Sequence, residues 1–133
     1  MTDLLSKVRW GRVLLAGLAT HVANFVVAVL LIFVYTLLAV EPQREPSGGI
    51  TDPLASLVGT WPVPILTLFA AVLVARRAEP ATAALHGLLV GLLVAVIFAV
   101  FYFVPFNVWG LLLFALMTAA GLVGGWIGRA DHN

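Results

Sequence analysis

The first long uncharged stretch of the chain reads VLLAGLATHVANFVVAVLLIFVYTLLAV (Val13–Val40). A helix needs about 20 mostly apolar residues to cross roughly 30 Å of hydrocarbon, so this stretch predicts a transmembrane helix. A secretory signal peptide has an apolar region of only about 7 to 15 residues before a cleavage site. Because the stretch is much longer, we expect it to be retained as the first helix of the protein.

Charged side chains are confined to short clusters that separate the uncharged stretches. The clusters are Asp3–Arg12, Glu41–Asp52, Arg76–Glu79 and Arg129–Asp131. Overall 62% of the residues are hydrophobic and only 10% are charged, whereas about 25% are charged in an ordinary soluble domain. A chain with so little charge lacks the side chains to cover a water-facing surface, and we expect lipid to cover it instead.

The pattern therefore predicts an all-α membrane protein, a single domain of four transmembrane helices. Proline and glycine mark the boundaries, since both disfavour the interior of a helix. The expected spans are residues 11–40, 54–76, 80–104 and 107–128, with an outer loop at 41–53. Pro62 and Pro64 predict a kinked or two-part second span, with residues 54–59 either interfacial or part of it. Pro105-Phe106-Asn107 predicts a tight hairpin between the third and fourth helices.

Orientation follows from the basic residues, because cytoplasmic loops are enriched in lysine and arginine. If the amino terminus is inside, the outer side holds only Arg44. The inner side holds six basic residues: Lys7, Arg9, Arg12, Arg76, Arg77 and Arg129. We expect a multi-pass protein of the inner or plasma membrane with both termini in the cytoplasm.

Small residues form regular rows in the third and fourth spans, where they allow helix backbones to approach closely. The predicted packing residues are Gly17, Ala83, Gly87, Gly91, Ala95, Ala99, Gly121, Gly124, Gly125 and Gly128. Packing within one chain is the main interpretation, and self-association through one of the rows is the alternative. The glycines near residue 121 lack the lysine of a phosphate-binding loop.

A few polar side chains interrupt the apolar stretches, and buried polar groups need partners. The candidate intramembrane residues are His21, Asn24, Tyr35, Thr67 and His86. His21 and His86 could approach one another from different helices. Three interpretations stay open for them: hydrogen bonds that join helices, a proton relay or polar path, and ligation of a haem or shared metal.

Catalytic signatures are missing from the sequence. No acidic residue lies inside a predicted span, there is no cysteine, and neither Gly-x-Ser-x-Gly nor His-Glu-x-x-His occurs. Two histidines without a third ligand do not define a metal site, and a net charge of +1 gives no reason to expect nucleic acid as a partner. We therefore expect no enzymatic activity, no cofactor and no bound metal.

Three segments carry a resemblance to known proteins. They are Leu85-His-Gly-Leu-Leu-Val-Gly-Leu-Leu, Gly124-Gly-Trp-Ile-Gly-Arg and Trp10-Gly-Arg-Val-Leu-Leu-Ala-Gly. In these and in its layout, the chain resembles small four-helix bacterial membrane proteins of unknown function. The resemblance implies the fold and no activity. The charged residue of small multidrug exporters and the asparagine and glycine signature of fluoride channels are not found.

The expected function is non-enzymatic: contacts between helices in the lipid bilayer, as a homo-oligomer or as an accessory subunit of a membrane complex. One alternative is a small transporter or channel whose polar path involves His21, Asn24, Thr67 and His86. Another is a haem-bearing electron-transfer subunit. Loss of flux in proteoliposomes on changing His21 to leucine would favour the transporter, and an absorption spectrum without a Soret band would exclude the haem protein.

Overall fold

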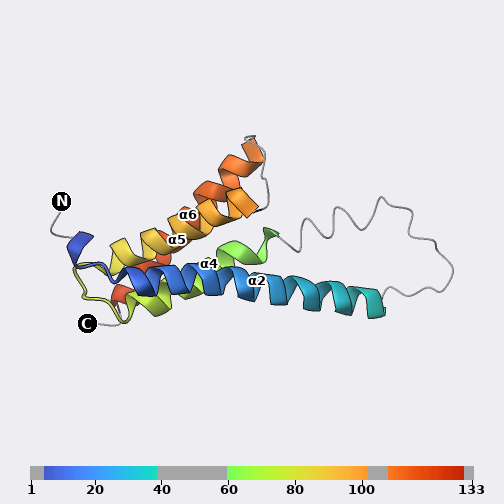
Figure 1. Cartoon of the computed structure of the whole chain (residues 1–133), viewed down its shortest axis with the longest axis horizontal. Helices are drawn as coiled ribbons and strands as arrows, with labels where there is room; N and C mark the ends of the chain where they lie inside the picture. Colours follow the sequence, from blue (N-terminus) through green and yellow to red (C-terminus); the bar gives the residue numbers. More distant parts are fainter. Residues whose placement is uncertain (1–4, 39–59, 102–107, 131–133) are drawn as a thin grey trace.

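A computed structural model describes residues 5–38, 60–101 and 108–130, and these ranges contain helices and no strand. The helices are α2 (Trp10–Leu38), α4 (Pro62–Ala75), α5 (Ala83–Phe101) and α6 (Val108–Ala130) (Figure 1). The all-helical fold class is thereby confirmed. The outer loop at 41–53, the segment 54–59 and the hairpin at 105–107 lie outside the described residues.

Three of these helices are long and apolar enough to cross a membrane: α2, α5 and α6. The fourth, α4, has 14 residues, which gives about 21 Å of helix at 1.5 Å per residue. That is less than the roughly 30 Å of the hydrocarbon core. It begins at Pro62, with proline at the first helical positions. The structure thus shows three helices of spanning length and a shorter fourth.

In the third and fourth expected spans, two boundaries differ by two residues or more. The third helix, α5, begins at Ala83 instead of residue 80, because the Thr82 amide donates to the Glu79 carbonyl (2.8 Å) in a tighter turn that precedes the helix. Pro80 lies within this turn and not at the first helical position. At the other end of the chain, α6 continues to Ala130, two residues past the expected end at Gly128.

Glycines bring α6 into close contact with two helices at once. On one side, a Cβ added to Gly121 would lie 2.5 Å from the Gly87 carbonyl oxygen and 2.6 Å from the Gly91 Cα, both on α5. On the other side, a Cβ at Gly124 would lie 2.6 Å from the Leu68 carbonyl oxygen of α4. The two rows of small residues on α6 therefore face different neighbours. Each lets the helix backbones approach to a distance that a larger side chain would prevent.

The remaining predicted packing residues divide between buried and exposed positions. Gly125 faces the start of α5 at Ala84, and Gly128 faces the end of α4 at Ala75. The row on α5 is buried along most of its length, at Ala83, Gly87, Gly91 and Ala95. Ala99, at the end of that row, is exposed, so the row makes contacts only over its first four members.

The first long helix, α2, packs on α4 and α5 and has no close contact with α6 among the described residues. Its buried side includes Val13, Gly17 and Thr20, and Gly17 lies against the Leu93 side chain of α5. Beyond Asn24, no residue of α2 whose side chain is described is buried. Figure 1 shows this second half of α2 extending past the other helices.

Candidate functional site

Four helix ends meet at one end of the molecule, where α2 and α5 begin and α4 and α6 finish (Figure 1). All charged residues of the described part of the chain lie there, next to these helix ends. We call this set the charged end: Lys7, Arg9, Arg12, Arg76, Arg77, Glu79 and Arg129. Six of its members are basic and one is acidic.

An arginine joins two elements of the charged end that are far apart in the sequence. The Arg12 guanidinium, at the start of α2, donates from Nη1 to the Arg77 carbonyl oxygen at 2.7 Å. Arg77 lies two residues after the end of α4, so the bond satisfies a carbonyl beyond the last turn of that helix. A cation is favourable here because the carbonyl end of a helix carries partial negative charge.

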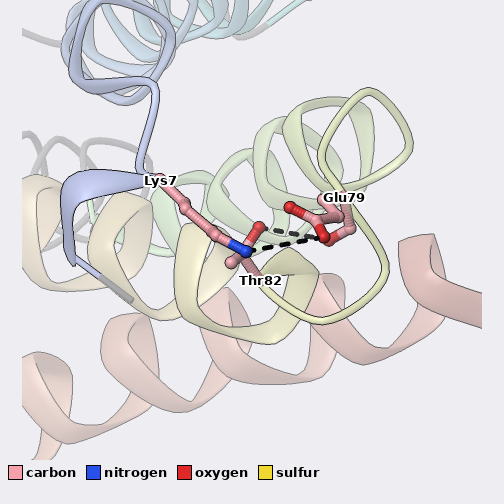
Figure 2. Close-up of polar contacts among 3 residues, drawn as sticks. All are labelled: Lys7, Glu79 and Thr82. Atoms are coloured by element: carbon pink, nitrogen blue, oxygen red, sulfur yellow. Dashed lines mark hydrogen bonds and ion pairs between the residues drawn. The ribbon is translucent and has the colours of Figure 1, made fainter. Parts of the chain in front are cut away.

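Glu79 is the single carboxylate of the charged end. Its Oε1 lies 3.9 Å from the Lys7 Nζ, and both side chains are more than half exposed, so the pair is screened by water and contributes little to stability. The Thr82 hydroxyl donates to the Glu79 main-chain carbonyl at 3.1 Å. Figure 2 shows Lys7, Glu79 and Thr82 together, in front of the first turn of α5. The hydroxyl holds the turn before α5, and the lysine reaches it from the segment before α2.

His86 is buried, with 1% of its surface exposed, and both of its ring nitrogens have partners. The Arg9 amide donates to Nε2 at 3.1 Å, so Nε2 must carry a lone pair. Nδ1 lies 2.8 Å from the Thr82 carbonyl oxygen, an acceptor, so Nδ1 carries the hydrogen and donates it. The imidazole is thus a neutral tautomer that ties the residues before α2 to the first turn of α5.

His21 lies at a different depth. Its Nε2 is 3.3 Å from the Val94 carbonyl oxygen of α5, eight residues beyond His86 on the same helix, which corresponds to about 12 Å. The two histidines therefore do not approach one another, contrary to the expectation from the sequence. Each makes a hydrogen bond to another segment, as the first of the three interpretations requires.

Three threonines of the spans bond within their own helices. Thr20 donates to the Ala16 carbonyl (2.8 Å), Thr67 to Val63 (2.7 Å) and Thr118 to Phe114 (2.9 Å), each four residues earlier. A hydroxyl satisfied in this way places no demand on a neighbouring helix. Thr67 is completely buried, as is Asn24 on α2. Tyr35 belongs to α2, and its side chain lies outside the described part of the structure.

Several contacts of the charged end involve main-chain atoms that sequence reasoning did not single out: the Arg9 amide, the Arg77 carbonyl and the Thr82 carbonyl. The only signal for them was the position of the basic cluster and of Glu79-Pro80 between apolar stretches. Among the described residues, no three histidines, cysteines or acidic residues lie close enough to hold a metal ion.

Fold and site together define a class: an all-helical protein with three helices of membrane-spanning length whose described charges gather at one end. Comparison with known proteins adds no narrower identity, because no protein-family model, curated protein or solved structure matches the chain.

Replacing His86 with leucine should release the residues before α2. The Arg9 amide would lose its acceptor, and leaving such a donor without a partner costs about 1 to 3 kcal/mol. We expect hydrogen exchange of the Arg9 amide in detergent-solubilised protein to accelerate by the corresponding factor. His21→Leu is the matched control, since its bond to Val94 is far from Arg9. If the Arg9 amide exchanges hydrogen at the same rate in His86→Leu as in the unmodified protein, this role of His86 is refuted.

Proposed function

We propose that the chain is a multi-pass integral membrane protein without catalytic activity, which works through contacts between its helices and those of other polypeptides. It would act as a homo-oligomer or as an accessory subunit of a membrane complex. The observation that carries the proposal is the exposure of α2 beyond Asn24. Val29 to Val34 are six consecutive apolar residues, and all six are exposed. Because successive helical residues point about 100° apart, no side of α2 is covered there by the described helices.

The packing of the other helices points to the same surface. The glycine rows of α6 are already occupied by α4 and α5, so they are not free to bind a second chain. The described histidines and threonines of the spans bond within the chain. Exposed apolar side chains also occur on α4, α5 and α6, for example Phe69 and Leu112, but each of these helices is packed against a neighbour on another side. Among the described residues only the second half of α2, which includes the aromatic side chain of Phe33, is exposed on every side.

Cross-linking can test this proposal cleanly because the chain has no cysteine. We expect a single Phe33→Cys variant to cross-link in native membranes, either to a second copy or to another membrane protein. Leu15→Cys is the matched control: Leu15 is equally exposed on α2 but lies in the half that packs on α4 and α5. The mass of the complex in mild detergent provides the independent readout. A monomer without partners and without Phe33→Cys cross-links would overturn the proposal.

The proposal includes the orientation, with the charged end and both termini in the cytoplasm and α4 forming part of the second of four spans. Six of the chain's seven lysine and arginine residues belong to the charged end, and cytoplasmic loops are enriched in these residues, which supports the orientation. A membrane-impermeant maleimide should label Ser47→Cys on intact cells and label Ser6→Cys only after permeabilisation. The reverse pattern would contradict the orientation, and labelling of both on intact cells would contradict the crossing of the membrane by α2, the one expected span between Ser6 and Ser47.

A further inference from the structure

We propose that the charged end binds the phosphate groups of anionic lipids, at the junction where residues 7–12 meet residues 76–79. This inference rests on the proposed membrane placement and goes beyond it, because placement alone requires no preference among lipids. The partner is identified by its chemistry: a phosphodiester carrying a net negative charge, held at the membrane surface.

The first argument is that two basic segments of the chain lie side by side. The bond from Arg12 to the Arg77 carbonyl brings the basic residues before α2 next to those after α4, although 65 positions separate the two partners. Glu79 is the only carboxylate among the described residues of the charged end, and it is already paired with Lys7. Asp3 and Asp131 lie outside the described residues. The exposed positive side chains of Arg9 and Arg77 favour an anion at this junction.

The second argument is the depth of the junction. Trp10 and Trp126 lie on α2 and α6 close to the same helix ends, and both are exposed. Indole rings favour the headgroup level of a bilayer. The basic side chains beside them would then lie at the level of the lipid phosphates. Arginine suits this position because its planar guanidinium can donate two parallel hydrogen bonds to one phosphate.

At two positions, a charged side chain can be replaced without removing a hydrogen bond of the fold. Arg9 contributes its main-chain amide to His86, and Arg77 contributes its main-chain carbonyl to Arg12. Both side chains are exposed. Arg9→Gln and Arg77→Gln therefore remove two charges and leave both main-chain atoms in place, so the double variant tests the lipid preference without removing a described contact.

Tryptophan quenching by brominated lipids measures the preference directly. In a Trp61→Phe/Trp109→Phe background, the remaining indoles are Trp10 and Trp126, beside the proposed site. The full chain is reconstituted in phosphatidylcholine vesicles containing brominated phosphatidylglycerol or brominated phosphatidylcholine. We expect brominated phosphatidylglycerol to quench the fluorescence at a lower lipid fraction than brominated phosphatidylcholine. This preference should fall about fivefold for each arginine replaced, since a basic residue at an anionic surface contributes about 1 kcal/mol.

Arg44→Gln is the matched control, because Arg44 belongs to the cluster assigned to the other side of the membrane and should leave the preference unchanged. Equal quenching by the two lipids in the parent protein would overturn the inference, and so would a preference that survives in the double variant. Loss of the preference in excess inorganic phosphate at constant ionic strength would reassign the site to a soluble anion. Absence of quenching by either lipid would instead overturn the membrane placement itself.

Discussion

Gly121→Leu should separate α5 from α6 and lower the free energy of unfolding by about 3 kcal/mol or more, at the upper end of what overpacking usually costs. The reason is the nature of the obstructing atoms. A Cβ at this position would lie 2.5 Å from a carbonyl oxygen and 2.6 Å from a Cα of α5, and backbone atoms in a helix cannot turn aside as a side chain can. Unfolding of the purified protein by SDS, followed by circular dichroism, measures the loss.

Two other glycines supply graded controls. Gly11→Ala should change the stability by no more than about 0.5 kcal/mol, because a Cβ there has nothing within 4 Å. Gly17→Ala should fall in between, since the atom it would approach is the end of the flexible Leu93 side chain. If Gly121→Leu unfolds at the same SDS fraction as Gly11→Ala, the close contact between α5 and α6 is wrong.

The small residues show how far a sequence pattern can go. Spacing by four residues indicates that Gly121 and Gly125 share one face and that Gly124 and Gly128 share another. It does not say which helix lies against which face, because glycine has no side chain whose chemistry could identify its partner. The structure supplies that assignment: the first pair faces α5 and the second faces α4. The sequence could therefore predict close packing of α6 but not its central position.

The expected start of the third helix at residue 80 was wrong. Pro80 satisfied the preference for proline in the first turn, yet the chain makes a separate turn there because the Thr82 hydroxyl and amide both bond to the Glu79 carbonyl. Such competition between a side chain and a regular helical bond depends on local geometry. Composition and spacing alone do not determine which of the two forms.

The histidines show why distances counted along a helix were insufficient. Counting from the helix starts placed His21 and His86 within reach of one another, but their partners are the Val94 carbonyl and the Arg9 amide. Every residue has a main-chain carbonyl, and every residue except proline has an amide N–H, so no residue type in the sequence identifies the partner. The need of each imidazole for a partner was predictable, whereas the identity of the partner depended on how α2 lies along α5.

Val26→Arg should prevent normal insertion of α2 into the membrane. Val26 lies near the middle of the uncharged stretch Val13–Val40, which follows the first charged cluster. About half of its side chain is exposed. An arginine at the centre of a spanning helix raises the apparent free energy of insertion by about 2.5 to 3.5 kcal/mol. That shift changes the equilibrium between inserted and excluded forms by roughly two orders of magnitude. Glycosylation mapping of the full chain in microsomes measures the inserted fraction.

Leu14→Arg is the depth control for this experiment, because Leu14 is comparably exposed on the same helix but only two residues from Arg12. Its guanidinium can reach the headgroup level, so we expect a much smaller loss of insertion. If both variants insert as well as the unmodified chain, the second half of α2 does not lie in hydrocarbon. Its exposed apolar residues would then require a protein partner in water, and the assignment of Val13–Val40 as a transmembrane helix would have to be abandoned.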